Sequence, residues 1–472
     1  MESVWFKTIF AILFYSLGFI LSVYALWRSR TPQGATAWII GLLSFPFVAV
    51  PAFIIFGRNK FYSYVKKRKK RDKVTEEILE FIDLSKNLHA DLPNHYSELR
   101  SVIAASQQID FTNNNKAELL INGKETYQSI LEAIDKAKKY ILFQFYIFNE
   151  DSTGKKFKEA LIKKSKEGVK VFFLYDAIGS RLSNYFISEL SEAGIKSYPF
   201  KSNKNWNTRL QLNFRNHRKI VVVDGQIAFV GGLNIGDEYV GLSEIGYWRD
   251  THIKIQGAAA LSAQMSFIKD WYWVSEKLLD LDWTVEKYVE NHKVCILTTG
   301  PADDKEICQL AHIALINMAR KKIILTSPYF VPTESFFNSI VMAAIRGVEI
   351  HILLPLKNDN ILVRAADKIY VEKLLSYGVK FYQYKKGFTH QKVIAIDDHL
   401  SVVGSANLDS RSFFINFEIT AMVSDEKVNR DLIAMLEVDI SNSKPFVYTD
   451  IKKRNLLQNI FSRAANLLSP ML

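Results

Sequence analysis

Two short stretches of the sequence carry the same polar residues at the same spacing. NHRKIVVVDGQIAFVGGLN covers residues 216–234, and THQKVIAIDDHLSVVGSAN covers residues 389–407. The apolar residues between the polar ones differ (IVVV against VIAI), so packing alone does not explain the repeat. We therefore predict that both stretches contribute to one functional site. The repeated residues are His217, Lys219, Asp224 and Asn234 in the first stretch, and His390, Lys392, Asp397 and Asn407 in the second.

These residue types indicate chemistry on a phosphodiester. Two ammonium groups and two amides suit an anion with several oxygens, such as a phosphodiester in its transition state. One imidazole can attack phosphorus, and the other, when protonated, can give its proton to the leaving alkoxide. The repeated set holds no carboxylate cluster, and the two cysteines, Cys295 and Cys308, form no CxxC motif. We therefore expect no metal and no other cofactor.

Carboxylates elsewhere in the chain could orient the two imidazole rings. Asp250, in YWRDTH, follows the first histidine at an interval similar to that at which Glu418, in NFE, follows the second. We expect each to orient the histidine of its own half, with surface exposure as the alternative. Asp224 lies in an Asp-Gly pair typical of a tight hairpin turn, and Asp397 occupies the same place. Both aspartates are therefore expected to have structural roles.

The pattern around the repeated stretches predicts an internal duplication. Each half reads strand, helix, strand, a further short strand and then a hairpin. Two similar α/β domains related by a pseudo-twofold axis would bring the two histidines together. Tyr146 and Tyr329 are equivalent in the repeat, and we expect them in the core rather than in the cleft. The expected domains cover residues 116–290 and 291–445, and the expected strands and helices cover 140–148, 155–167 and 169–177 in the first half and 322–332, 335–346 and 348–356 in the second.

The first part of the chain predicts attachment to a membrane. Residues 5–27 and 35–56 are apolar, and each run is long enough to cross a hydrocarbon core of ~30 Å. We expect a transmembrane helical hairpin over residues 1–57, although Pro46 and Pro51 would kink or shorten the second helix. A cleaved signal peptide is the alternative for the first run. The loop 28–34 is then expected outside the cell.

The distribution of basic residues predicts on which side of the membrane the rest of the chain lies. Residues 58–115 form the expected linker, which is partly helical and begins with a run rich in Lys and Arg. The positive-inside rule places that run in the cytoplasm. The net charge of +12 indicates an anionic partner, and anionic lipid headgroups account for it without nucleic acid. Residues 446–472 predict a basic amphipathic helix, either in the membrane interface or packed on the protein's own core.

The repeated pattern HxKxxxxDxxxxxxG(G/S)xN resembles the HKD motif of the phospholipase D superfamily. RSRTPQGATAWI, NFRNHRK, YWRDTH, SPYFVP, SANLDSRSF and LLSPML are similar to its bacterial cardiolipin synthase branch, so the resemblance covers nearly the whole chain. Gly232 stands where Ser is common in the superfamily. The resemblance implies an α/β fold of two phospholipase D-like α-β-α domains preceded by the transmembrane hairpin. It also implies that the His, Lys and Asp of both motifs form the catalytic set, and that Asn234 and Asn407 bind the substrate phosphate.

The resemblance further implies a phosphatidyl transfer between two phosphatidylglycerol molecules. A histidine would attack the first, release glycerol and carry a phosphatidyl group, which the second would accept to give cardiolipin. The superfamily pattern makes His217 the nucleophile and His390 the acid and then the base, whereas the residues alone do not separate them. The implied location is the bacterial plasma membrane, with anionic lipids as partners and no oligomeric state indicated.

Two other functions are compatible with the same residues. The site could hydrolyse its substrate, as a phospholipase D that releases phosphatidic acid or as a membrane-tethered nuclease. Alternatively, the protein could be an inactive scaffold whose basic surface gathers anionic lipids. The two apolar runs beside the basic segment favour a lipid substrate, and the intact duplicate motifs favour an enzyme.

Overall fold

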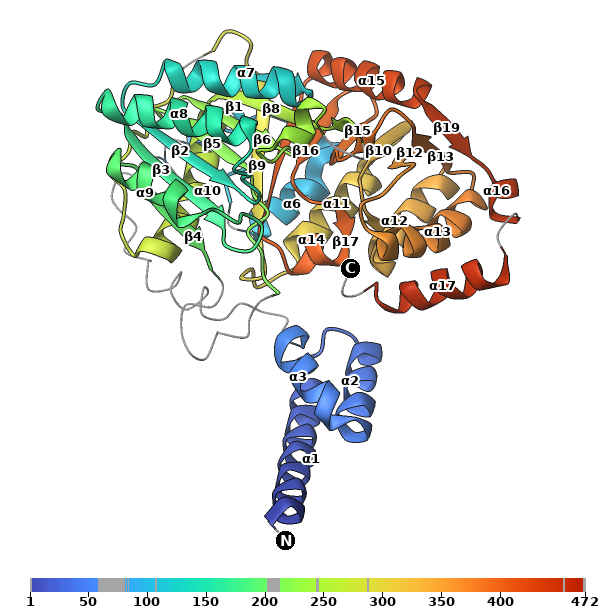
Figure 1. Cartoon of the computed structure of the whole chain (residues 1–472). Coiled ribbons are helices and arrows are strands. Elements are labelled where there is room, and N and C mark those ends of the chain that lie inside the picture. Colours follow the sequence, from blue (N-terminus) through green and yellow to red (C-terminus); the bar gives the residue numbers. More distant parts are fainter. Residues whose placement is uncertain are drawn as a thin grey trace.

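The computed structural model describes residues 2–57, 81, 83, 85–106, 108–201, 213–242, 246–286, 288–452 and 455–469. The basic run after residue 57 and the last residues of the chain therefore lie outside the described residues. Figure 1 shows the two halves of a large α/β body side by side, with the N-terminal helices below them.

A single mixed sheet runs through both halves. Equivalent strands of the two halves follow one another in the same order outward from the centre, apart from the additional edge strand β19. The order is β19-β13-β12-β10-β15-β16-β18-β9-β1-β8-β6-β5-β2-β3-β4, so β1 and β9 meet at the middle as an antiparallel pair. This arrangement confirms the predicted duplication. The strands of the first half are β1 (Thr112–Ile121), β2 (Tyr140–Phe145), β3 (Lys170–Asp176), β4 (Lys196–Phe200), β5 (Ile220–Val223), β6 (Ile227–Gly231) and β8 (Thr251–Gly257). Those of the second half are β9 (His292–Thr299), β10 (Lys322–Thr326), β12 (Glu349–Pro355), β13 (Lys380–Tyr384), β15 (Val393–Ile396), β16 (Leu400–Gly404), β18 (Glu418–Ser424) and β19 (Ser443–Phe446).

Helices cover both faces of the sheet, because successive strand residues point to opposite faces. In β5, Ile220 and Val222 join a core cluster with α10 and α15, which spans both halves of the protein. Val221 and Val223 instead join a cluster with α7 and α8. The core helices are α7 (Asn122–Asp135), α8 (Ser152–Lys166), α9 (Asn184–Glu192), α10 (Ala258–Ser275), α11 (Ile307–Met318), α12 (Glu334–Ile345), α13 (Ile361–Leu375) and α15 (Glu426–Ser441).

Shorter elements complete the body. The smallest pairings are β7 (Trp248–Arg249) with β14 (Phe388–Thr389) and β11 (Phe330–Val331) with β17 (Leu408–Asp409). Between residue 81 and β1 lie a 3-10 turn (Asn94–Tyr96) and α6 (Ser97–Ala105), and a second 3-10 turn (Asp237–Val240) follows β6. The remaining short helices are α14 (Ser410–Phe414), α16 (Tyr448–Lys452) and α17 (Leu456–Leu467).

The N-terminal unit differs from the expected hairpin of two spanning helices. α1 (Glu2–Arg28) contains a stretch from Trp5 to Arg28 that is the one helix, among the described residues, long and apolar enough to cross a membrane. The second apolar run is divided into α2 (Pro32–Ser44) and α3 (Pro46–Phe56). The helix breaks at Phe45 because Pro46 follows it, as the sequence had signalled. The interruption expected from Pro46 is therefore present, and neither α2 nor α3 is long enough to be the second spanning helix of the expected hairpin.

The C-terminal segment contains two helices, of which α17 packs on α13. Ala465 of α17 is buried in a cluster with residues of α13 and β11. The large apolar side chains of α17 remain exposed, with Leu457 75% and Phe461 45% accessible. The helix therefore contacts the protein's own core through its small residues and presents its large apolar residues outward. Figure 1 places α17 on the side of the body that faces the N-terminal helices.

Candidate active site

Just before its hairpin, the backbone of the first motif pairs with a segment of the second half of the protein. Asn216 forms an isolated parallel bridge with Phe417, and the backbone amide of His217 donates to the Phe417 carbonyl at 2.9 Å. Glu418 follows directly and begins β18, so its side chain comes to lie beside the first histidine. Glu418 Oε2 is 2.9 Å and Oε1 is 3.1 Å from Nδ1 of His217.

The second motif has the equivalent arrangement, in which the segment before its hairpin pairs with the first half of the protein. β14 runs parallel to β7, and the backbone amide of His390 donates to the Arg249 carbonyl at 2.8 Å. Asp250 follows Arg249, and its Oδ2 lies 2.6 Å from Nδ1 of His390. The expectation that each carboxylate orients the histidine of its own half is therefore wrong. Each half supplies the carboxylate for the other half's histidine, because the short parallel pairings cross between the halves.

Both imidazole rings are buried and held by Nδ1, and among the described residues Nε2 of each ring has no hydrogen-bond partner. Burial lowers the pKa of His217 to about 4, although Glu418 opposes this shift. Burial and the two motif lysines lower the pKa of His390 well below its usual value. Both rings are therefore neutral at pH 7 when no anion is bound. A neutral ring with a free Nε2 can act as a nucleophile or accept a proton.

The two orienting carboxylates have different environments. Burial alone would raise the pKa of Glu418, but His217, Lys219 and the Ser405 hydroxyl hold that pKa below its usual range. Burial raises the pKa of Asp250 to about 6, and Lys392 and a backbone amide offset it only in part. The Ser405 hydroxyl donates to Glu418 Oε2 at 2.5 Å. The two halves are thus alike in geometry but unequal in electrostatics.

The lysines lie beneath the histidines, and the two asparagines differ in their contacts. Lys219 Nζ donates to the His217 carbonyl at 2.7 Å, and Lys392 is buried in the same place of the second motif. Asn234 is fixed, since its Oδ1 accepts from the Ile147 amide at 3.1 Å and its Nδ2 donates to Tyr239. Asn407 Oδ1 is buried and has no hydrogen-bond partner in the described structure. Asn407 therefore retains hydrogen-bonding capacity for a ligand.

The motif aspartates lie away from the rings, at the turns of the hairpins. Asp224 and Asp397 have φ of 52° and 51°, and each accepts hydrogen bonds from three successive backbone amides at the start of a neighbouring strand. These contacts tie β5–β6 to β2 and β15–β16 to β10. The structural role expected for both aspartates fits this geometry.

A pocket of about 400 Å³ lies between the two histidines. Tyr146 and Tyr329 both line it, so the expectation that they pack in the core is wrong. Tyr146 meets the His217 ring edge-on at 4.8 Å between centroids, and Tyr329 donates to Asp359. Several other lining residues were not predicted from the sequence, although some lie in the quoted segments NFRNHRK, YWRDTH and SANLDSRSF. They are Ile147, Arg215, Trp248, Asp359, Asn360, Val363, Asp409, Arg411 and Asn416.

A buried arginine next to the first histidine was also missed. Arg218 Nη1 donates to both oxygens of Asp270 at 2.8 Å, and its Nη2 donates to the Thr299 carbonyl at 3.0 Å. Its Nε donates to the carbonyl of Glu418 at 3.1 Å. This side chain therefore joins α10, β9 and β18 beneath the site. No group of three or more His, Cys, Asp or Glu side chains that could hold a metal occurs among the described residues.

Known proteins match the chain over nearly its whole length. The family model "Cardiolipin synthase, PLD-like domain" matches residues 130–264 and 312–440. Cardiolipin synthase A of Pseudomonas putida strain KT2440 is 38% identical over 98% of this chain and 97% of its own length. The protein of the same name from Pseudomonas aeruginosa strain LESB58 is 36% identical over 97% and 94%. Among solved structures, phosphatidylserine synthase from Haemophilus influenzae shares the fold, with a TM-score of 0.62, 15% identity, and coverage of 79% of this chain and 100% of that chain.

Proposed function

Because the chain belongs to the family of cardiolipin synthases with phospholipase D-like domains, we propose that it is a phosphatidyltransferase that converts two phosphatidylglycerol molecules into cardiolipin and glycerol. One observation carries the proposal: two histidines from the two halves face one pocket, and each is oriented through Nδ1 by a buried carboxylate. Such a pair can divide a phosphodiester exchange into two displacement steps.

In the first step, His217 Nε2 attacks the phosphorus of the donor phosphatidylglycerol. The bond from phosphorus to the glycerol oxygen breaks, and His390 Nε2 gives its proton to that oxygen, which releases glycerol. His390 is neutral in the empty pocket, but the negative phosphodiester raises its proton affinity as the substrate binds. Glu418 stabilises the positive charge that develops on the His217 ring.

In the second step, a terminal hydroxyl of another phosphatidylglycerol gives its proton to His390 and attacks phosphorus. The bond from phosphorus to His217 Nε2 breaks, and cardiolipin leaves. Lys219, Lys392, Asn234 and Asn407 stabilise the charge on the phosphoryl oxygens, so neither step needs a metal ion. The assignment of His217 as the nucleophile and His390 as the acid is part of this proposal. If water replaces the second lipid, the product is phosphatidic acid.

The proposed location is the plasma membrane, with the catalytic body on the cytoplasmic side. The spanning stretch of α1 supports membrane attachment, and the basic run after residue 57 supports the cytoplasmic side through the positive-inside rule. The exposed apolar row of α17 and the adjacent bilayer would both limit the access of water to the phosphatidyl intermediate. Anionic lipids are the expected partners, and nucleic acid is not.

The test is product analysis with the purified full-length protein in liposomes that contain labelled phosphatidylglycerol. We expect cardiolipin and glycerol in equal amounts, unchanged by a chelator. His217→Ala and His390→Ala should each abolish product, whereas His351→Ala, on β12 and outside the pocket, should retain activity. Phosphatidic acid without cardiolipin would instead identify a hydrolase. Full product formation by both motif variants would overturn the proposed site.

Rapid quenching in denaturing detergent at neutral or mildly alkaline pH distinguishes the roles of the two histidines, because the phosphorus–nitrogen bond of a phosphatidyl-histidine survives there and is hydrolysed in acid. With a donor that carries a good leaving group, His390→Ala should still accumulate a labelled phosphatidyl-enzyme, because such a group leaves without a proton. His217→Ala should accumulate none. The opposite pattern would assign the nucleophile to His390.

A further inference from the structure

Cardiolipin carries two phosphates joined by one glycerol, so the second substrate brings its own negative charge to the pocket. A three-carbon glycerol separates the attacking hydroxyl of the acceptor lipid from its phosphate. That phosphate must therefore lie in the same pocket as the reacting phosphorus, next to it but apart from it. The lysines of the motifs are buried beneath the histidines, and the proposed function assigns them to the first phosphate.

Two arginines in the pocket wall form no salt bridge in the described part of the chain, although the charges of Asp409 and Asp176 act on Arg411 and Arg215 respectively. Arg411 of α14 donates to Asn213 Oδ1 at 2.8 Å and to the Asn213 carbonyl at 2.7 Å. Arg215 donates to the Phe214 carbonyl at 3.1 Å. All these acceptors are neutral, so both guanidiniums retain their charge and several of their five N–H donors. Both side chains are half-buried and line the pocket beside His217 and Tyr146.

The two guanidiniums are close enough to oppose each other's charge. Burial lowers the pKa of Arg411; Asp409 opposes that shift, and the positive charge of Arg215 adds to it. Asp409 is itself occupied as the cap of α14, where its Oδ1 accepts from the Ser412 amide at 2.7 Å. Two neighbouring cations whose hydrogen-bond acceptors among the described residues are all neutral form a suitable site for an anion with several oxygens.

We infer that Arg215 and Arg411 bind the phosphate of the acceptor phosphatidylglycerol. This inference rests on the proposed function, and it assigns the second of the two lipid phosphates to residues outside both HKD motifs. The acceptor phosphate bound there would place its glycerol hydroxyl toward the phosphatidyl group on the histidine. Arginine suits this role better than lysine, because its planar fork can hold two phosphate oxygens at once.

The test compares two acceptors, one with a phosphate and one without. Liposomes of phosphatidylglycerol are supplied with labelled glycerol, so that cardiolipin formation and exchange of glycerol into phosphatidylglycerol are measured together. We expect Arg215→Gln and Arg411→Gln to lower the ratio of cardiolipin formed to glycerol exchanged by about tenfold or more, with the Lys variants in between. Arg181→Gln, which removes an exposed arginine outside the pocket, should leave this ratio at the parent value.

The outcomes separate the subsite from the function. If the parent protein forms no cardiolipin, the proposed function fails. If the parent does form it but the Gln variants lower both reactions equally, the arginines serve the donor phosphate or the structure, and the subsite inference is overturned. An unchanged ratio overturns it in the same way.

A second inference concerns the membrane, and it comes from the N-terminal unit. The segment that joins α1 to α2 touches the catalytic body. Arg30 Nε lies 3.0 Å from Glu306, and its guanidinium lies 3.6 Å from the centre of the Phe414 ring on α14. The loop 28–34 is therefore on the side of the catalytic domains. A loop on the opposite side of the bilayer, as expected from the sequence, could not make these contacts.

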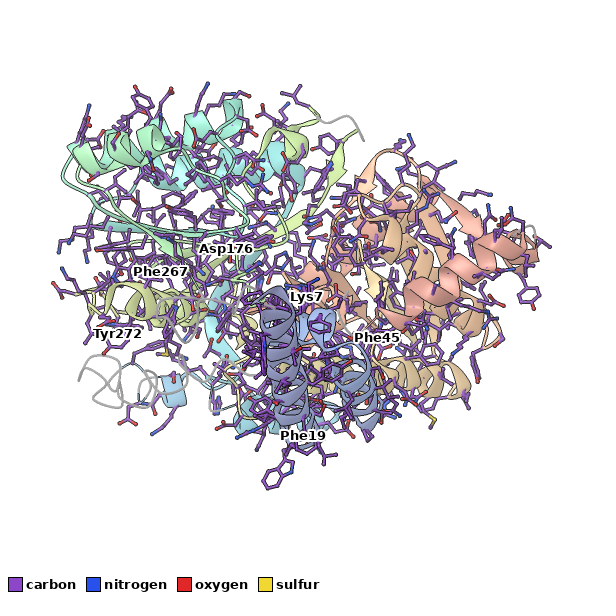
Figure 2. All side chains as sticks on the ribbon, turned by 60° about the horizontal axis from the view of Figure 1, so that its bottom comes forward. Lys7, Phe19, Phe45, Asp176, Phe267 and Tyr272 are labelled. Carbon is purple, nitrogen blue, oxygen red and sulfur yellow. The ribbon has the colours of Figure 1, made fainter. Side chains whose placement is uncertain are left out.

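α2 and α3 form a bent hairpin that returns to the same side. Phe47, at the start of α3, packs near Phe14 and Tyr15 in the middle of α1, and Phe53, near its end, packs against Tyr24. α3 therefore runs back toward the catalytic body beside α1. Figure 2 brings this unit forward, in front of the catalytic body, with Phe45 of the bend labelled.

The length of α2 limits how deeply this hairpin can reach. Its 13 residues give a helix about 20 Å long at the usual rise per residue, which is shorter than the ~30 Å thickness of a hydrocarbon core. The bend lies beside Gly18, where a Cβ atom would be 2.5 Å from the Leu42 carbonyl oxygen and 3.4 Å from Pro46 Cβ. Small residues at such contacts are typical of close helix packing in membranes. The hairpin therefore ends at mid-membrane depth.

We propose that α1 alone crosses the bilayer, and that α2 and α3 form a re-entrant hairpin that enters and leaves on the catalytic side. The charge distribution supports this arrangement independently. It places Arg28 and Arg30 on the same side as the basic run after residue 57, as the positive-inside rule requires, whereas an external loop would place both on the wrong side. The N-terminus then lies on the far side of the membrane.

Labelling with a membrane-impermeant maleimide in intact cells tests this topology. The native Cys295 and Cys308 are buried, and the parent chain measures their background. We expect Ser3→Cys to be labelled from outside, and Gln33→Cys to be protected until the membrane is opened. Tyr185→Cys, exposed on the catalytic body, is the control for protection. Labelling of Gln33→Cys in intact cells, or protection of Ser3→Cys there, would overturn the proposal.

Discussion

Gly232 and Ser405 occupy the same place in the two motifs, and the different surroundings of the two positions account for the different residues. The Ser405 hydroxyl donates to Glu418, which orients His217. At Gly232, an added Cβ would lie 2.2 Å from Asp250 Oδ1. Asp250 thus fills the space that a serine side chain would need. This explains why glycine stands where the superfamily pattern commonly has serine.

We expect Gly232→Ser to lower kcat by about 10- to 100-fold, which is the usual effect of displacing a group that orients a catalytic residue. Asp250 cannot move freely, because its Oδ1 accepts from the Thr251 amide at 2.7 Å while its Oδ2 is bound to His390. Steady-state kinetics on phosphatidylglycerol liposomes measures the effect. The matched variant Ser405→Gly removes a hydrogen bond without a clash and should lose less activity. Equal losses in the two variants would contradict the steric explanation.

At the scale of elements, the aspartate at the turn of each catalytic hairpin forms hydrogen bonds to the backbone at the start of a neighbouring strand. Asp397 accepts hydrogen bonds from the amides of Arg320, Lys321 and Lys322, and its φ of 51° disfavours most other residues. We expect Asp397→Ala to lower the free energy of unfolding by about 2–4 kcal/mol, with kcat per folded molecule nearly unchanged.

Thermal unfolding of the solubilised protein measures this loss. The neighbouring Asp398→Ala serves as the control, because the Asp398 side chain is 72% exposed and pairs with Lys321 only at the surface. Its effect should stay below about 1 kcal/mol. A large loss of kcat in Asp397→Ala without loss of stability would assign the aspartate a chemical role instead.

The helix α17 leaves its large apolar residues outside the protein, next to the pocket. It packs on α13, whose residue Val363 lines that pocket. We expect Leu457→Glu to lower activity on phosphatidylglycerol in liposomes by about three- to tenfold, because the charge opposes insertion of the helix into the interface. Activity on a soluble short-chain phosphatidylglycerol should change little.

Val438→Glu provides the matched control for this helix. Val438 is 59% exposed on α15, which Figure 1 places on the side of the body away from the N-terminal helices. This variant should behave like the parent on both substrates. Equal losses on liposomes from both variants would argue that α17 does not contact the membrane.

At the scale of the whole molecule, the two halves share one sheet and one core cluster that spans both, and each histidine is oriented by the other half. A buried histidine in this core also links stability to pH. His252 in β8 is 1% exposed; its Nδ1 accepts from the Leu233 amide at 3.3 Å, and its Nε2 has no partner in the described structure. Burial lowers its pKa from 6.5 to about 3.

The sign of the pH effect follows from this shift. Between about pH 6.5 and pH 3, the unfolded chain binds a proton at His252 and the folded protein does not, so the contribution of this residue to stability falls as the pH falls. We expect His252→Asn to reduce the loss of stability between pH 7 and pH 5 by about 2 kcal/mol. Thermal unfolding at both pH values measures it, and parallel losses in parent and variant would contradict it.

Features that depend on local spacing could be predicted from the amino-acid sequence alone. Short apolar runs predicted the strands at 140–148 and 169–177, which the structure has as the shorter β2 and β3, and the repeated polar set predicted the duplication. Pro46 signalled the interruption of the second apolar run, because a proline restricts the residue before it. These signals lie within a few residues of one another, so no knowledge of distant contacts was needed.

Contacts between residues that are distant in the sequence became known only from the folded structure. The exchange of Glu418 and Asp250 between the histidines depends on two short parallel pairings between the halves, which no local pattern encodes. Arg215 belongs to the first half and Arg411 to the second, and both line the same pocket. Their proximity likewise depends on contacts between the halves, which no local pattern encodes. The proposed position of loop 28–34 on the catalytic side rests on the contact of Arg30 with Glu306 and Phe414, which the sequence did not indicate. Hydrophobic periodicity specifies a helix but not which distant surface its end will touch.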